Sequence, residues 1–287
     1  MLIELPAQVL ELSGPDAIAF SQAQFSSDLR TLHTGSWQWS AWLSAQGRVR
    51  CWFALLRLAD DRLLLWLRGA DAAALRADLG RFVFRSKVNL AARDIRVYGT
   101  NAPATTQAIG SVPSGQTLAQ HAGIAALRLP DGERYVLIAL DARLHVEDDA
   151  AAAARWRLDD IRAGLPELSP MLRERFLPQW LGLDRLGAVS VGKGCYPGQE
   201  IMARLHFKGG NKRGLYRIAW SAPALPEAGT ELRRSDPDAE AGTIVTSAAA
   251  GASRAEALAV LIDDAAHLPL HAPMLAPTDI QVISRFS

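Results

Sequence analysis

A glycine-rich segment interrupts the second half of this 287-residue chain. It runs from Gly187 to Glu200 and contains four glycines and one proline. Glycine is costly inside helices and strands, and proline lacks the backbone N–H that both structures need. We therefore expect an ordered loop over these residues, with the regular elements on either side of it.

The residues before this loop alternate between strand-like and helix-like patterns of apolar side chains. The first helix is expected to start at Ser13, as its cap, with Pro15 in the first turn. A stretch rich in Pro, Gly, Thr and Ala, 100–115, is typical of a loop. The predicted elements are strands over 9–12, 37–43, 48–58 and 62–67, a hairpin of 123–129 with 134–140, and helices over 13–29, 71–84 and 147–163.

The residues after Lys212 and Arg213 have a different texture, with short apolar stretches separated by Pro, Gly, Asp and Ser. This pattern is typical of a small antiparallel barrel or sandwich. We predict an α+β protein with an α/β region over 1–211, built from one or two interleaved subdomains, and a carboxy-terminal antiparallel β-barrel over 212–287. The strands expected in that barrel are 215–220, 229–234, 242–246, 255–262 and 280–285.

Charge and hydropathy exclude several classes of protein. Lys and Arg number 31 against 30 Asp and Glu, so the chain lacks the broad cationic field of a nonspecific nucleic-acid or membrane binder. Apolar runs such as 63–67 are much shorter than the roughly 20 residues of a membrane helix. Two distant cysteines favour reduced thiols. We expect a soluble, cytoplasmic protein with no membrane partner.

Cys195 is the candidate reactive residue of the loop. Lys193 lies two residues before it, and a nearby ammonium stabilises the thiolate, the form that acts as nucleophile or metal ligand. The alternative is a small buried hydrophobic side chain, the commoner role of a lone cysteine. That structural role is the one we expect for Cys51, which lies in a predicted strand. Gly192-Lys193-Gly194 does not complete a phosphate-binding loop, because Gly194 occupies the position of the required hydroxyl.

No metal site is expected from the spacing of potential ligands. The chain has no C-x-x-C and no H-E-x-x-H motif, and its six histidines show no paired spacing of a known type. One cysteine cannot complete the four-thiolate shell of an iron–sulfur cluster. Any contact with a cluster would therefore be transient and shared with a partner.

A basic stretch follows the loop, from Arg204 to Arg217. A solvated surface is one interpretation of such a charge run. The other is an anion site, for a polycarboxylate tail or for RNA phosphates, and either ligand would lose affinity as salt rises. The cationic residues of the stretch are Arg204, His206, Lys208, Lys212, Arg213 and Arg217.

The segment from Lys193 to Glu200, KGCYPGQE, closely resembles the K-G-C-Y-x-G-Q-E signature of the YgfZ family. Other stretches match the family as well: LSGPDA over 12–17 with Phe20, Gln22 and Gln24, QGRV over 46–49, RAGLP over 162–166 and LPQ over 177–179. The resemblance implies the fold of the tetrahydrofolate-dependent aminomethyltransferase (T protein) of the glycine cleavage system. It also implies folate binding, a link to iron–sulfur cluster assembly or repair, and an effect on cluster-dependent tRNA thiomodification.

The resemblance also assigns candidate site residues. Cys195 and Lys193 carry the chemistry, and Trp156 stands where the family has a tryptophan that could stack on a pterin or aminobenzoyl ring, with core packing as the alternative. Many members carry a glutamate where this chain has Arg162; Asp159 or Asp160 could substitute for it. The residues expected to bind tetrahydrofolate or a derivative are Trp156, Tyr196, Gln199, Glu200 and Arg204.

Three functions are consistent with these residues. The leading one is a folate-binding accessory protein that serves iron–sulfur enzymes and, through them, tRNA modification. The second is a folate-dependent one-carbon transferase, which would need an acid or base carboxylate facing the folate nitrogen. The third is an RNA-binding module that uses the basic stretch 204–217.

Overall fold

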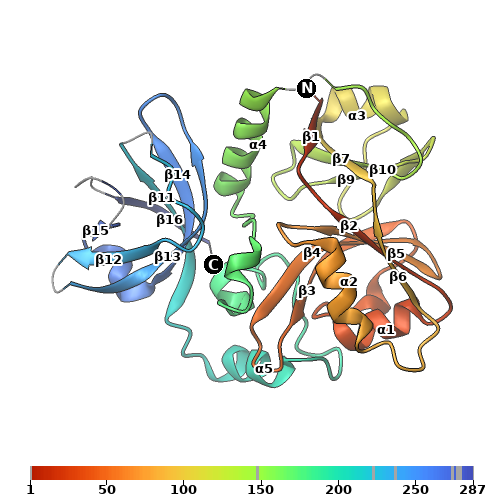
Figure 1. Cartoon of the computed structure of the whole chain (residues 1–287), viewed down its shortest axis with the longest axis horizontal. Coiled ribbons are helices and arrows are strands. Elements are labelled where there is room, and N and C mark those ends of the chain that lie inside the picture. Colours follow the sequence, from red (N-terminus) through yellow and green to blue (C-terminus); the bar gives the residue numbers. More distant parts are fainter. Residues whose placement is uncertain are drawn as a thin grey trace. The chain divides into compact units, whose positions relative to one another are not determined.

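The computed structural model describes residues 2–146, 149–221, 224–235, 238–272, 275 and 280–286 (Figure 1). The strands are β1 (Leu2–Leu5), β2 (Val9–Ser13), β3 (Ser36–Leu43), β4 (Val49–Ala59), β5 (Arg62–Leu67), β6 (Asn89–Arg93), β7 (Arg96–Asn101), β8 (Ala119–His121), β9 (Ile124–Arg128), β10 (Arg134–Ala139), β11 (Arg213–Trp220), β12 (Glu231–Ser235), β13 (Asp238–Ala249), β14 (Ala255–Ile262), β15 (Leu270–His271) and β16 (Gln281–Phe286). The α-helices are α1 (Ala17–Gln24), α2 (Ala72–Gly80), α3 (Ala102–Ile109), α4 (Ala150–Ala163) and α5 (Gln199–Lys208). Short 3₁₀ helices cover Leu29–Thr31, Pro170–Leu172, Pro178–Leu181 and Asp263–His267.

The chain forms two compact units that are interleaved in sequence. Unit 1 comprises Met1–Trp42, Cys51–Ala153 and Gly187–Pro197. Unit 2 comprises Leu43–Arg50, Ala154–Leu186 and Gly198–Ser287. The expected boundary near residue 212 stays a prediction.

Unit 1 contains an antiparallel five-stranded sheet in the order β3-β4-β5-β2-β6. Helices α1 and α2 cover one of its faces (Figure 1), and their apolar residues share a core with Phe25, Phe53 and Leu65. Side chains alternate between the faces of a strand, so Trp52 and Trp66 lie on the opposite face, where they stack with Trp39. Both faces are therefore apolar, which explains why β4 and β5 are almost continuously hydrophobic.

A second antiparallel sheet of unit 1 has the order β1-β7-β10-β9-β8. The hairpin predicted for 123–129 and 134–140 is confirmed as β9 and β10, in which Tyr135 pairs with Arg128. Helix α3 packs on this sheet through Ile109, which shares a small core with Tyr98 and Leu137. This sheet thus has its own hydrophobic core.

Unit 2 contains an antiparallel six-stranded sheet in the order β15-β12-β13-β14-β11-β16. The strands predicted after residue 212 are confirmed, and the short β15 is additional. The ladders shift register within the β12–β13, β13–β14 and β11–β16 pairs, and such bulges bend a sheet. One antiparallel bridge joins Leu270 to Ile280. The sheet is curled, but these pairings do not show the closed barrel that the sequence predicts.

The first helix is shorter than predicted at both ends. It begins after Asp16 and ends at Gln24, whereas we expected a helix from Ser13 to about Leu29. Phe25 instead adopts an extended conformation and forms a bridge with Trp42 of β3. Pairing with a distant strand therefore overrides the helical pattern beyond Gln24.

Two helices occur where we expected loops. Helix α3 lies within 100–115, capped by the side chain of Asn101, which accepts from the N–H of Ala104, and ended by the left-handed Gly110. Helix α5 begins at Gln199, inside the glycine-rich segment. The start expected for α4, at 147, lies outside the described residues. No helix among the described residues has both the length and the apolar character needed to cross a membrane.

Candidate functional site

The Cys195 loop, defined here as residues 187–197, is held against the segment that follows α1. The backbone N–H of Ser190 donates to the carbonyl of Ser26 at 2.8 Å, and the Ser26 hydroxyl donates to the carbonyl of Ala188 at 2.7 Å. Further along, the Gln22 amide donates to the carbonyl of Lys193 at 3.3 Å. The two segments are thereby joined at three points within unit 1.

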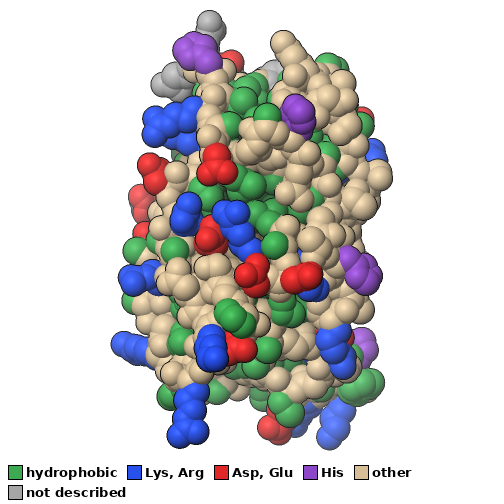
Figure 2. All heavy atoms as spheres, turned by 90° about the vertical axis from the view of Figure 1, so that its right-hand side faces the viewer, with side chains coloured by type: hydrophobic (Ala, Val, Ile, Leu, Met, Phe, Trp, Pro, Cys, Tyr) green, Lys and Arg blue, Asp and Glu red, His purple; other side chains and the backbone are tan. Residues whose placement is uncertain are grey.

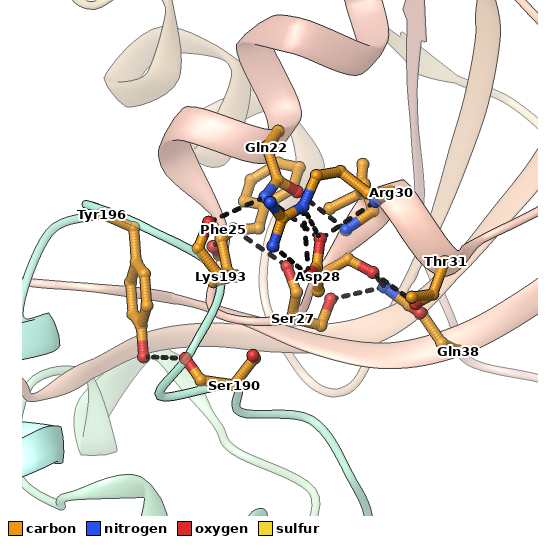
Figure 3. A network of polar contacts seen from close by, with 11 residues as sticks. Gln22, Phe25, Ser27, Asp28, Arg30, Thr31, Gln38, Ser190, Lys193 and Tyr196 are labelled. Atoms are coloured by element: carbon orange, nitrogen blue, oxygen red, sulfur yellow. Dashed lines mark hydrogen bonds and ion pairs between the residues drawn. The ribbon is translucent and has the colours of Figure 1, made fainter.

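Lys193 is the central anchor of this contact (Figure 3). Its side chain is buried, with 5% exposure, and its Nζ donates to the carbonyls of Phe25 at 2.5 Å and Ser27 at 2.9 Å. Nζ also lies 5.0 Å from the centre of the Tyr196 ring, a cation–π distance. These carbonyls are available because the helix ends at Gln24, so the early termination of α1 creates the receptor for Lys193.

The electrostatic surroundings of Lys193 are mixed. Burial lowers its pKa from 10.5 to about 8, while the negative charge of Asp28 opposes this change and the positive charge of Arg30 adds to it. Arg30 itself forms a 2.7 Å ion pair with Asp28, and the hydrogen bond lowers the pKa of that carboxyl to about 2. Lys193 therefore remains mostly protonated at neutral pH, but within reach of a mildly alkaline titration.

Tyr196 is a second support of the loop. Its ring is buried, and its hydroxyl donates to the carbonyl of Ser190 at 3.0 Å, which closes the loop on itself (Figure 3). Burial raises the pKa of Tyr196 to about 12. The residue expected to bind folate thus has a visible structural role, and its contact with a ligand stays a prediction.

Cys195 lies between these two buried anchors and is itself exposed, as a free thiol. Cys51 is buried in the core on β4, as the structural interpretation expected. The Lys193 ammonium points at backbone carbonyls, so its visible role is to position the loop. Activation of Cys195 by Lys193 stays a prediction.

The remaining loop residues expected to bind folate lie on α5, in unit 2. Gly198 precedes the helix with a φ of +81°, and a side chain at this position would meet the Ser44 carbonyl at 2.6 Å. Gln199 is partly exposed in the first turn of α5, and Glu200 and Arg204 are exposed. The glycine therefore permits a close approach that sets where this helix begins.

Trp156 and Arg162 lie on α4 and are both engaged within unit 2. Trp156 is 4% exposed, which fits the core-packing alternative. The Arg162 guanidinium donates to both carboxylate oxygens of Glu256 on β14, at 2.8 and 3.3 Å, and Glu256 also lies 3.4 Å from Arg217. Arg162, which departs from the family pattern, is thus paired with a carboxylate on β14.

The basic stretch 204–217 is divided by its surroundings. Arg213 pairs with Glu240 at 2.9 Å and stacks on Trp180, and Arg217 faces Glu256. The side chains of this stretch that remain exposed are Arg204, His206, Phe207, Lys208 and Lys212. Only this first part of the stretch offers a free cationic surface.

The side chains described here suit one end of a folate better than the other. The exposed Arg204 can pair with glutamate carboxylates, whereas Trp156 is buried and Arg162 is already bound to Glu256.

Within the described part of the chain, no group of three or more His, Cys, Asp or Glu residues could hold a metal ion.

Two curated proteins are similar to the chain over most of its length. The tRNA-modifying protein YgfZ of Klebsiella pneumoniae (strain 342) is 30% identical over 251 residues, which cover 82% of this chain and 76% of that protein. The tRNA-modifying protein YgfZ of Edwardsiella ictaluri (strain 93-146) is 30% identical over 254 residues, with the same coverage. The chain belongs to the YgfZ family. No protein-family model matches it.

The fold of this YgfZ-family chain is similar to that of a solved enzyme. The crystal structure of the glycine cleavage system aminomethyltransferase T from Bartonella henselae matches with a TM-score of 0.73 at 18% identity. The match covers 99% of this chain and 84% of the enzyme. The T-protein-like, mixed α/β fold expected from the sequence is therefore confirmed.

The sequence did not reveal which residues of this YgfZ-family chain receive Lys193. Phe25 and Ser27 lie 168 and 166 residues away and contribute backbone carbonyls, which any residue type could supply. Glu256, the partner of Arg162, was missed for a similar reason, since 94 residues separate the two. The run Gln22 to Asp28 offered only a weak signal, through its polar side chains.

Proposed function

We propose that this chain is a folate-binding accessory protein that supports iron–sulfur cluster assembly or repair and, through it, tRNA modification, with Cys195 as its reactive group. Its relatives are named tRNA-modifying proteins, and its fold is similar to that of a glycine cleavage system aminomethyltransferase. Closure of the carboxy-terminal sheet into a barrel is part of this proposal, supported by the Leu270–Ile280 bridge.

One observation carries the proposal: an exposed thiol is held between two buried anchors. Burying an ammonium costs free energy unless its hydrogen bonds are satisfied, and Lys193 satisfies two of its three donors with carbonyls. The arrangement fixes the backbone on both sides of Cys195 and leaves its sulfur accessible, which suits a thiol that reacts with a partner molecule.

The folate would be bound mainly through its charged end. Arg204 is exposed on α5, and a guanidinium pairs well with the carboxylates of a glutamate tail. A bound reduced folate would supply one-carbon or redox chemistry. The protein's own contribution would be to hold this tail and to present the Cys195 thiol.

Replacement of Cys195 tests the reactive role. In cells that lack their own family member, Cys195→Ala and Cys195→Ser should fail to restore thiolated tRNA nucleosides, measured by mass spectrometry of digested tRNA. Cys51→Ala is the matched control, because it removes the buried thiol and should retain activity. Both Cys195 variants should unfold in urea like the wild type. Full activity in both would remove Cys195 from the function.

Quenching of tryptophan fluorescence by tetrahydrofolate tests the ligand. Binding should be saturable and weaker at high salt, and Arg204→Ala should weaken it by about tenfold, the worth of one charge-assisted contact. Lys208→Ala on the same helix is the control. Trp156→Phe shows whether that indole lies in the site; unchanged affinity would leave it in the core.

A second candidate function is RNA binding by the exposed part of the basic stretch. Phe207 is 75% exposed between His206 and Lys208, and an exposed ring flanked by cations can stack on an unpaired base. Charge reversal of Lys208 and Lys212 should weaken the electrophoretic shift of tRNA at physiological salt. An unchanged tRNA affinity in this double variant would exclude α5 as an RNA site.

A further inference from the structure

The turn between α2 and β6, residues 81–87, is firmly attached to unit 1 at its base. Its backbone closes on itself, since Phe82 donates to Leu79 at 2.9 Å and Ser86 donates to Val83 at 2.8 Å. The Phe82 ring meets the Trp42 ring edge to face, with centres 6.0 Å apart. At the far end, the N–H of Lys87 donates to the Asp16 carboxylate at 2.6 Å. The turn is therefore held to unit 1 at both of its ends.

Phe84 lies in the middle of this turn and is unfavourable in two respects, the exposure of its ring and the conformation of its backbone. Its side chain is 88% exposed, the largest exposure among the exposed large hydrophobic residues described. Its φ is +38°, a left-handed backbone conformation that a bulky non-glycine residue rarely adopts. An aromatic residue thus combines backbone strain with loss of burial, and strained, exposed residues cluster at functional sites.

The same turn carries three cationic residues. Arg81, Arg85 and Lys87 are exposed, and the run from 81 to 87 contains no acidic residue. None of the three forms an ion pair with a carboxylate in the part of the chain that the structure describes. The face of the molecule shown in Figure 2 mixes Lys and Arg side chains with Asp and Glu side chains. The turn is a local cationic site with an aromatic centre.

We propose that this turn, residues 81–87, binds single-stranded RNA. Phe84 stacks on one unpaired base, and Arg81, Arg85 and Lys87 contact the adjacent phosphates. Stacking needs only one accessible ring, and the flanking cations match the charge of the backbone. A protein or lipid interface needs a wider apolar surface. Here Phe82 and Val83 are partly buried against the core, so Phe84 is the exposed apolar side chain of the turn.

This site lies in unit 1 and does not depend on the folate or on Cys195. It also differs from the candidate RNA surface on α5, so variants of each can be compared. The probe is a fluorescently labelled RNA hairpin with a single-stranded loop, and the readout is anisotropy over a salt series. The comparison ligands are the same duplex without an unpaired loop and vesicles containing an anionic phospholipid.

Phe84→Ala should weaken binding of the looped hairpin by roughly 5- to 100-fold, the range for one stacked base. Phe84→Trp should retain binding. Arg85→Ala should reduce the slope of log affinity against log salt by about one. Phe84→Gly should weaken RNA binding while keeping or raising thermal stability, because glycine tolerates the positive φ; this variant separates loss of the ring from loss of the fold.

Val112→Ala, which trims another exposed apolar side chain of unit 1, is the matched control and should bind the hairpin as before. The proposal is overturned if the wild type does not bind the hairpin at physiological salt, or if Phe84→Ala binds it unchanged. Equal binding of the loop-free duplex would also overturn it, as would vesicle binding that requires Phe84 when RNA binding does not.

Discussion

Replacement of Lys193 by methionine removes the ammonium that fixes the Cys195 loop and keeps most of the volume of the side chain. The substitution leaves the carbonyls of Phe25 and Ser27 without the donor that each has now. A buried acceptor stranded in this way costs about 1–3 kcal/mol, so the two together cost about 2–6 kcal/mol. Relief of the buried charge offsets part of this loss. We expect a net decrease of about 2 kcal/mol in the free energy of unfolding.

The two free thiols allow this decrease in the free energy of unfolding to be measured by their rates of reaction. Ellman's reagent should react quickly with the exposed Cys195 and slowly with the buried Cys51, which becomes accessible only on opening. A loss of about 2 kcal/mol should accelerate the slow phase about 30-fold when closing is faster than reaction. Urea unfolding should give the same difference.

Lys208→Met is the control for loss of a lysine, since Lys208 is exposed and should change neither quantity. A slow phase and a urea midpoint that are unchanged by Lys193→Met would refute the assignment of Lys193 as the anchor of the loop.

Two further predictions follow from the same loop. The stability difference between the wild type and Lys193→Met should grow as the pH rises from about 8 towards 10. The pKa of Lys193 is about 8 in the folded chain and 10.5 ordinarily, so in this window the unfolded chain binds the extra proton and the stability of the wild type rises with pH. A difference in urea stability that is constant with pH would contradict the lowered pKa. Gly198→Ala should lower the free energy of unfolding by about 3 kcal/mol or more, because of the positive φ and the close approach to the Ser44 carbonyl. Gly194 has a φ of +96° but open space around it, so Gly194→Ala should lower that free energy by only about 1–2 kcal/mol. Equal losses in urea unfolding would argue against the close approach.

Many of the strands could be predicted because their signals are local, but β1, β6, β7 and β8 were not expected. Alternating apolar residues and the turn at Pro130-Asp131-Gly132 were enough to identify β9 and β10, which face each other across that turn. Helix α3 was missed because its residues, Ala-Pro-Ala-Thr-Thr-Gln-Ala-Ile, resemble a loop in composition. Its caps, Asn101 and Gly110, were readable in the sequence and would have revealed it.

The arrangement of the candidate site could be predicted only in part. The motif KGCYPGQE marked the loop and its exposed thiol, but the position of Lys193 depends on where α1 ends. That end depends in turn on the bridge between Phe25 and Trp42. Long-range pairing of this kind leaves no periodic trace in the residues that it displaces.

The interleaving of the two units has a consequence for synthesis of the protein on the ribosome. The hydrogen bond from Ser26 to Ala188 spans 162 residues, and that from Lys193 to Phe25 spans 168. Unit 1 therefore cannot be completed until more than two-thirds of the chain has left the ribosome, although most of its strands are made early. No single cut releases either unit as a continuous fragment. During this interval the carbonyls of Phe25 and Ser27 lack the Lys193 donor that they have in the folded protein.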